Sequence, residues 1–222
     1  MGVKTVYSKR RNLYDSAMNG KYILIYLISG LLLWGLACKS PFSTREPEPP
    51  DDDSSARFID ASLPEVVFEN LEYAFADRNV ENYIRSFVDS TRSQLRFLFL
   101  PDQSVAANHP GVFLNWLIEN ERRYMEQLLQ VVPSDSALSL LFLNKTQQSP
   151  TVNDVTFDVD YIIIARHTKQ DVNIPENLPV VMKGNAKFRL AKNQTGTWEI
   201  YRWEDFSNST DPSWSELKAA LR

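Results

Sequence analysis

Cysteine and histidine are nearly absent from this chain of 222 residues. Cys38 is the only cysteine, and His109 and His167 are the only histidines. A single cysteine cannot form an internal disulfide, and two histidines exclude a histidine-rich metal site. A serine–histidine–aspartate triad would have to use one of these two imidazoles. No strong catalytic motif accompanies them, so we predict no catalytic residue, no metal and no cofactor.

An excess of positive charge is also missing. The chain has 24 lysines and arginines against 28 acidic residues. Residues 38–222 contain 19 of the basic residues and 27 of the acidic ones. No basic patch stands out along the sequence. Proteins that bind nucleic acids neutralise phosphates with clustered lysine and arginine, so we expect no nucleic acid partner.

Long apolar runs are missing too, with one exception near the N-terminus. The run Tyr22–Ala37 has 16 residues, fewer than the roughly 20 that a membrane-spanning helix needs. Several basic residues precede the run, and the small residue Ala37 stands directly before Cys38. A positive region, an apolar core and a small residue at the end are typical of an export signal.

The end of this run, Leu31–Cys38, resembles a bacterial lipoprotein signal. The resemblance implies that residues 1–37 are a signal peptide and that Cys38 becomes the first residue, carrying palmitate and further acyl chains. Gly35 departs from the pattern, because lipoprotein signals usually have leucine there. An ordinary signal peptide and an uncleaved anchor remain open, as does a start at Met18 instead of Met1.

The segment after Cys38 is rich in proline, serine and acidic residues, most densely in 46–53. Such a composition cannot bury a core, so we predict a lipidated cysteine and disordered linker at 38–57 and one domain at 58–222. Lys39 stands where some lipoproteins of the inner membrane have aspartate. The lipoprotein resemblance therefore implies the bacterial cell envelope, preferably the outer membrane, with the domain in the periplasm or outside the cell.

Apolar spacing predicts an α+β domain whose helices come mostly before its strands. Ser62 and Glu65 fit a capping box at the start of the first helix. The stripe of the third helix places Glu121 among its solvent-facing residues. Strands that follow helices favour an antiparallel sheet. The predicted helices cover 62–76, 80–89, 112–129 and 213–221, and the predicted strands cover 95–100, 137–145, 155–168, 180–191 and 197–206.

Several segments resemble the NTF2-like superfamily, which includes SnoaL-like and ketosteroid-isomerase-like proteins. They are Pro64–Phe75 followed by Asp77–Asn79, then Asn82–Tyr83, Gly184–Leu190, Trp198–Asp205 and Ser213–Lys218. The resemblance implies a half-open cone, in which a curved antiparallel sheet packs on about three helices. It leaves function open, because the superfamily contains isomerases, dehydratases and binding modules.

A pocket in such a cone would draw on acidic and aromatic side chains. Asp158 and Asp160 share one face of the predicted strand 155–168 with Arg166, because side chains alternate along a strand. The same rule puts Trp198 and Ile200 on one face of the last strand and Tyr201 and Trp203 on the other. The candidate pocket residues are Tyr83, Trp116, Tyr124, Asp158, Asp160, Arg166, Tyr201 and Trp203.

Each of these residues also has a structural interpretation. The acids can pair with Lys187 and Arg189 on a neighbouring strand, and the aromatic rings can fill the core. Arg202 and Asp205 fit either a pocket or an ion pair. A buried acid with a raised pKa beside a tyrosine hydroxyl would favour an enzyme. A cone filled by its own aromatic side chains would exclude both pocket hypotheses, the enzyme and the ligand-binding module, and leave protein contact.

The sequence therefore favours a non-enzymatic lipoprotein of the cell envelope, tethered to the membrane, whose NTF2-like domain binds a ligand or another protein. The alternative is a small isomerase or dehydratase of the SnoaL-like type. The expected partners are the membrane, through the lipid anchor, and a small apolar ligand or an envelope protein. A homodimer is a further expectation.

Overall fold

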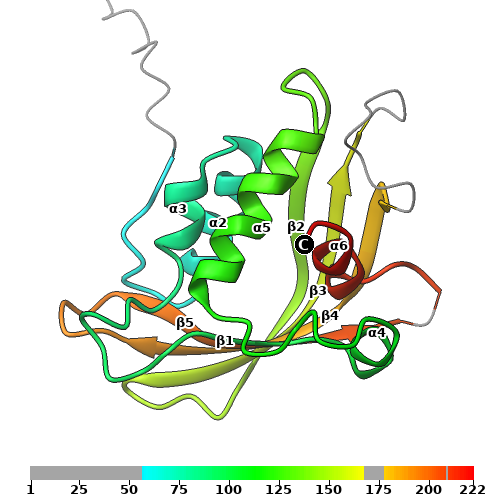
Figure 1. Cartoon of the computed structure of the whole chain (residues 1–222). Coiled ribbons are helices and arrows are strands. Elements are labelled where there is room, and N and C mark those ends of the chain that lie inside the picture. The colour runs from blue at the N-terminus through cyan, green and yellow to red at the C-terminus, as the bar shows by residue number, and fades with distance from the viewer. Residues whose placement is uncertain (1–56, 168–177, 209) are drawn as a thin grey trace, which may run out of the picture. The chain divides into compact units, whose positions relative to one another are not determined.

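The computed structural model describes residues 57–167, 178–208 and 210–222 (Figure 1). The predicted signal peptide, Cys38 and the predicted linker up to residue 56 lie outside these described residues. Within the described ranges, no helix has both the length and the apolar character required to cross a membrane.

Five strands form one curved sheet that does not close, in the order β1-β5-β4-β3-β2. Neighbouring strands run antiparallel except for β1, which pairs with β5 in parallel. The predicted fold class, α+β with a curved antiparallel sheet packed on helices, is confirmed. The strands are β1 (Leu98–Leu100), β2 (Leu138–Gln148), β3 (Asp154–Ala165), β4 (Val181–Lys192) and β5 (Trp198–Ser207).

Helices α2, α3, α5 and α6 lie along the hollow side of this sheet, with α6 beside the strands and α5 next to it, whereas α4 lies apart from them beyond the end of β1 (Figure 1). Their bounds are α2 (Val66–Ala76), α3 (Val80–Ile84), α4 (Gln103–Asn108), α5 (Ile118–Val131) and α6 (Trp214–Ala220). The predicted break after the first helix is confirmed. There Arg78 has φ of 54°, and its guanidinium donates to the carbonyls of Val132, Pro133 and Ser136 beyond α5.

Helix starts differ most from the prediction. The capping box of Ser62 and Glu65 is wrong, because α2 begins at Val66 and no side chain caps it. The third predicted helix begins at Ile118 instead of 112, since Gly111 and Asn115 adopt positive φ values of 84° and 53°. The sequence prediction also missed α4, which Asp102 caps by accepting from the backbone N–H of Ser104 at 2.9 Å.

The core lies in the hollow of the sheet, and every second residue of β3 points into it. Burial alternates strictly along this strand, as predicted, and Phe157 and Tyr161 are among its buried residues. The alternation predicted for β5 is wrong. A bulge opposite Arg189 and Leu190 interrupts the register, so that both Ile200 and Trp203 are fully buried.

Candidate functional site

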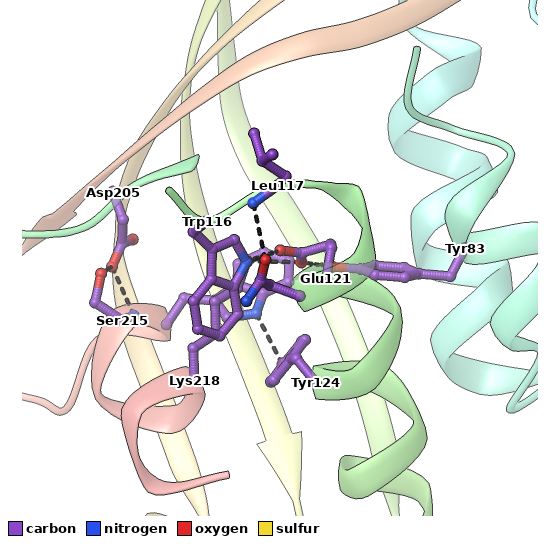
Figure 2. A network of polar contacts seen from close by, with 10 residues as sticks. Tyr83, Trp116, Leu117, Glu121, Tyr124, Asp205, Ser215 and Lys218 are labelled. Carbon is purple, nitrogen blue, oxygen red and sulfur yellow. Dashed lines mark hydrogen bonds and ion pairs between the residues drawn. The ribbon is translucent and has the colours of Figure 1, made fainter. Parts of the chain in front are cut away.

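An ion pair lies at the centre of the hollow, between α5 and α6. Glu121 and Lys218 have no exposed surface, and the Lys218 ammonium lies 2.6 Å from each carboxylate oxygen of Glu121. Figure 2 shows the two side chains pointing toward each other from their helices. Taking two charges out of water is costly, so a pair at this depth requires further polar contacts.

Two aromatic side chains provide those contacts to Glu121. The hydroxyl of Tyr83 in α3 donates to Oε1 at 2.5 Å, and the indole N–H of Trp116 donates to Oε2 at 2.7 Å. Each carboxylate oxygen therefore accepts from the ammonium and from one ring (Figure 2). No hydrogen-bonding capacity of Glu121 remains for a substrate at this position.

Aromatic rings surround the Lys218 ammonium on its other sides. Nζ lies 3.7 Å from the ring centroid of Trp203 and 3.8 Å from that of Phe99. The rings of Tyr124, Trp116 and Trp214 follow at 5.2, 5.5 and 5.8 Å. A cation within about 6 Å of a ring face is attracted by the electrons of the ring. We call these five rings and Glu121 the ammonium cage.

The cage changes the acid–base chemistry of its members. Burial lowers the pKa of Lys218 to about 8, and the Glu121 carboxylate limits that fall. Burial and the charge of Glu121 raise the pKa of the Tyr83 and Tyr124 hydroxyls well above the ordinary value. The tyrosines therefore stay protonated and act as hydrogen-bond partners.

A second buried acid, Asp205 of β5, holds the start of α6. It accepts from the Tyr161 hydroxyl at 2.7 Å and from the backbone N–H and hydroxyl of Ser215 at 2.8 and 2.6 Å. The Tyr161 hydroxyl in turn accepts from the backbone N–H of Trp214 at 2.7 Å. Burial raises the pKa of Asp205, although these hydrogen bonds oppose the rise.

Two larger hollows among the described residues share no lining residue with the cage. One of about 580 Å³ is lined by α3, the segment 87–92 and the start of α5. Another of about 480 Å³ lies between α4 and the segment before α6. A small cavity of about 90 Å³ adjoins the cage itself, where Trp116 and Tyr124 meet Leu221 and Arg222.

The structure brings four of the eight candidate pocket residues together. Tyr83 and Trp116 bind Glu121, whereas Tyr124 and Trp203 border Lys218. All four rings are part of the core. The four rings therefore follow the structural interpretation given above, in which aromatic side chains fill the core, and their role as a pocket stays a prediction.

The other four candidates lie elsewhere. Asp158 and Asp160 are on the sheet face opposite the core and bind the amide of Asn185 at 2.6 and 3.2 Å. Arg166 is exposed beyond the end of β3. The Tyr201 hydroxyl donates to Asp154 at 2.9 Å. Asp158 and Asp160 share one face of β3 as predicted, but that face is the outer one, and the strand ends before Arg166.

The sequence prediction missed both charged members of the site. Glu121 was assigned to the solvent-facing side of its helix, which is wrong. It precedes the buried Tyr124, Met125 and Leu128 by three, four and seven residues, so helical spacing alone puts it on the buried stripe. Lys218 follows the buried Trp214 by four residues and precedes the buried Leu221 by three, which also puts it on a buried stripe, although lysine is almost never fully buried.

The remaining titratable candidates form local contacts. His109 lies 3.4 Å from a carboxylate oxygen of Glu216, and His167 contacts the carbonyl of Leu178 at 2.8 Å. The ion pair considered for Arg202 and Asp205 is wrong, because Arg202 pairs with Glu204 at 2.8 Å. The described residues contain no group of three or more histidine, cysteine, aspartate and glutamate side chains arranged to hold a metal.

No protein-family model matches the chain, and no curated protein matches it. Among solved structures, the chain is similar to an NTF-2 like protein of unknown function from Shewanella oneidensis, with 11% identity over 64% of this chain and 93% of that one and a TM-score of 0.44. It is also similar to a ketosteroid isomerase-like protein from Erwinia carotovora, with 13% identity, 66% and 95% coverage and a TM-score of 0.43. These likenesses concern the fold alone.

Proposed function

We propose that this chain is a non-enzymatic binding module of the bacterial cell envelope, tethered to the membrane through Cys38. The observation that carries the proposal is the filled hollow of the sheet. Lys218 and Glu121 occupy its centre with no exposed surface, and Trp203 and Trp214 pack beside them with ring centroids 4.2 Å apart. These side chains are packed in the core of the described residues, which supports a role other than turnover of a substrate at this position.

The isomerase or dehydratase alternative rests on Asp205 and Tyr161. Their position and the raised pKa of Asp205 are those expected for a catalytic acid or base. A general base must, however, lie within hydrogen-bonding distance of a substrate proton. The oxygens of Asp205 bind Tyr161 and Ser215 instead, which supports a role in fixing α6 and argues against catalysis.

Contact with another protein is supported by the outer face of the sheet. Leu141, Leu143 and Val181 are 47%, 38% and 39% exposed. On this face Leu141 lies opposite Ile162 and Val181 opposite Ile164, both on β3, the strand between β2 and β4, whereas Leu143 lies opposite Asp160. An exposed apolar patch with a polar surround is typical of an interaction surface. An envelope protein or a second copy of this chain fits this patch.

Photo-crosslinking in cells tests the protein contact. A photoreactive phenylalanine analogue at Val181 should give one discrete crosslinked product, whose mass identifies either a second copy or another protein. The same analogue at Gln194, in the loop between β4 and β5, serves as a matched control and should give none. Equal labelling at both positions, or none at Val181, would show that the patch is not an interface.

The enzyme alternative is tested by turnover. The full chain should leave a β,γ-unsaturated ketone and a β-hydroxy ketone unchanged, as followed by the ultraviolet absorbance of the conjugated product. Turnover that disappears in Tyr161→Phe and Asp205→Asn would overturn the proposal and establish the alternative.

A further inference from the structure

The hollow of about 580 Å³ between α3, the segment 87–92 and the start of α5 has the size of a small-molecule site. We call it the α3–α5 groove. It is separate from the filled core, because no residue of the ammonium cage lines it. Several of its lining residues are exposed, among them Arg85, Thr91 and Glu119. A ligand therefore reaches the groove without any movement of buried side chains.

The floor of the α3–α5 groove is apolar. Phe87 and Val88 line it and are only 3% exposed. Ile84 of α3 and Ile118 of α5 also line it, and both are partly buried against the core. Contact with such a floor removes apolar surface of a ligand from water, which favours binding of an apolar group.

The walls of the groove are held in place by contacts beyond it. The Tyr83 hydroxyl of α3 donates to the Glu121 carboxylate of α5 at 2.5 Å. The backbone N–H of Val88 donates to the carbonyl of Ile200 in β5 at 2.9 Å. The three segments around the groove are thus fixed before a ligand arrives, and a preformed site loses little affinity to ordering.

The lining of the groove is positive, although the chain is acidic. Four arginines and three acids line it, whereas residues 38–222 contain 19 basic and 27 acidic residues. Two of the three acids are already paired with lining arginines. Glu81 accepts from Arg122, with one of the two contacts at 3.0 Å, and Asp89 accepts from Arg92 at 2.8 Å. The lining therefore keeps one net positive charge, which favours a monoanion.

Arg85 and Arg123 are the lining arginines without a carboxylate partner among the described residues. The Arg85 guanidinium lies 3.8 Å from the ring centroid of Phe58, and Arg123 donates to the backbone carbonyl of Glu119 at 3.4 Å. The third acid of the lining is Glu119, in the first turn of α5, where the helix dipole favours a negative charge. A guanidinium has five N–H donors, so both arginines keep donors for an anion.

We propose that the α3–α5 groove binds an amphipathic carboxylate, a molecule with an apolar body and one carboxylate group. The apolar body lies on Ile84, Phe87 and Ile118, and the carboxylate accepts hydrogen bonds at the rim from Arg85 and Arg123. This ligand site goes beyond the protein contact on the outer face of the sheet. It depends neither on that contact nor on the membrane anchor.

Methyl NMR of the full chain in a neutral maltoside detergent tests the proposal, with 4-phenylbutanoate as the probe. Isoleucine methyl groups labelled with carbon-13 report the site, because Ile84 and Ile118 line the groove, whereas Ile162 and Ile164 lie on the outer face of β3. We expect saturable shifts of the Ile84 and Ile118 signals with a Kd in the millimolar range, as for other ligands of this size. The signals of Ile162 and Ile164 should not move.

Two further probes test the charge of the ligand. The uncharged 4-phenylbutanamide has the same apolar body, and 4-phenylbutylammonium carries the opposite charge. Both should bind about threefold to fivefold more weakly than 4-phenylbutanoate, since neither forms charge-assisted hydrogen bonds with a guanidinium at the exposed rim.

Three variants locate the carboxylate. Arg85→Gln and Arg123→Gln each remove one cation but keep a long side chain, and each should weaken binding of 4-phenylbutanoate about threefold to fivefold. Binding of 4-phenylbutanamide should stay as it is in the wild type. Arg166→Gln changes an exposed arginine beyond the end of β3. It is the matched control and should alter neither affinity.

Four results would overturn the proposal. Equal affinities for the carboxylate and the amide would show that the arginines do not select an anion. Shifts at Ile162 and Ile164 as large as those at Ile84 would show binding without a defined site. Wild-type affinity in both Arg85→Gln and Arg123→Gln would place the anion elsewhere. Shifts at Ile84 caused by phosphatidylglycerol in the micelle, but by no free carboxylate, would assign the groove to a lipid headgroup. None of these results bears on the crosslinking or turnover experiments, so the two proposals fail separately.

Discussion

At the scale of single residues, Glu121 and Lys218 form an ion pair that is fully buried. Both side chains lie in the core without exposed surface. An ion pair in such a place stabilises the fold only while both partners remain, because removal of one leaves the other charge buried and uncompensated. Breaking the pair by removing one partner should therefore cost more free energy of unfolding than the intact pair contributes, and in this sense it couples α5 to α6.

This coupling predicts strong non-additivity between two substitutions. Lys218→Met and Glu121→Gln should each lower the free energy of unfolding by about 3–5 kcal/mol, since each breaks a buried pair. The double variant should be less destabilised than the sum of the two by about 0.5–3 kcal/mol. Chemical denaturation followed by tryptophan fluorescence measures all four proteins. Additive effects would mean that the two side chains do not interact in solution.

The lowered pKa of Lys218 predicts a pH dependence of stability. The pKa is about 8 in the folded chain, against 10.5 for an ordinary lysine. Between these values the unfolded chain binds more protons, so this group raises the free energy of unfolding as pH rises from about 8 toward 10.5. The contribution is lost as pH falls through 8. Its slope is at most about 1.4 kcal/mol per pH unit.

The difference between wild type and Lys218→Met isolates this effect. The buried tyrosines have raised pKa values and act in the opposite direction above pH 10, but both proteins contain them. The wild type should therefore gain stability over Lys218→Met between pH 8 and 10. A constant difference across this range would show that Lys218 titrates as an exposed lysine does.

Residue chemistry sets a limit on what the sequence could predict here. Helical spacing places Glu121 and Lys218 on buried stripes. Charged residues are seldom fully buried, however, and for this reason the sequence prediction placed Glu121 on the solvent-facing side. The partners lie 97 residues apart along the chain. Only the fold shows that each one compensates the other, whereas the aromatic members of the cage were predictable because large rings belong in a core.

At the scale of elements, β4 shows how closely the sheet and α6 fit. Gly184 faces Tyr161, and a Cβ atom added to it would lie 2.5 Å from the Tyr161 hydroxyl and 2.6 Å from the carbonyl oxygen of Phe206. The hydroxyl cannot retreat easily, because Asp205 and the Trp214 backbone hold it at 2.7 Å on both sides. Glycine at this position leaves room for the Tyr161 hydroxyl to bind Asp205 and the backbone N–H of Trp214 at the start of α6.

Gly184→Ala should therefore destabilise the domain by about 1–3 kcal/mol, the usual range for overpacking. Lys183→Ala, one residue earlier on the outer face, is the matched control and should change stability by no more than about 0.5 kcal/mol. Thermal unfolding compares the two variants. Equal small effects would mean that the Tyr161 hydroxyl adjusts without loss of its hydrogen bonds.

Strands were easier to predict than helix starts for a physical reason. The alternation of β3 repeats over 12 residues, so its faces could be assigned from sequence alone. A bulge such as that in β5 adds one residue without any local signal and reverses the faces after it. The start of α5 depends on the left-handed backbone of Asn115, a conformation that asparagine adopts more readily than most residues but that most asparagines do not have.

At the scale of the whole molecule, the proposed function combines a folded domain with a membrane anchor. The folded domain, with its filled hollow, supports binding over catalysis. The anchor rests on the sequence alone, on the apolar run before Cys38 and the acidic linker after it. Several acyl chains on one cysteine bury many methylenes, each contributing about 0.8 kcal/mol to membrane binding, so lipidation would hold the domain at the membrane permanently.

Cys38→Ala tests the anchor directly. In cells fed radiolabelled palmitate, the wild-type chain should carry label and sediment with membranes, whereas Cys38→Ala should lose the label and be released. Ser40→Ala, two residues later, is the matched control and should behave as the wild type. Loss of label without release would indicate that the apolar run itself remains as an uncleaved anchor. Retention of the label would contradict lipidation at Cys38, because the chain has no other cysteine that could carry a thioester or thioether lipid.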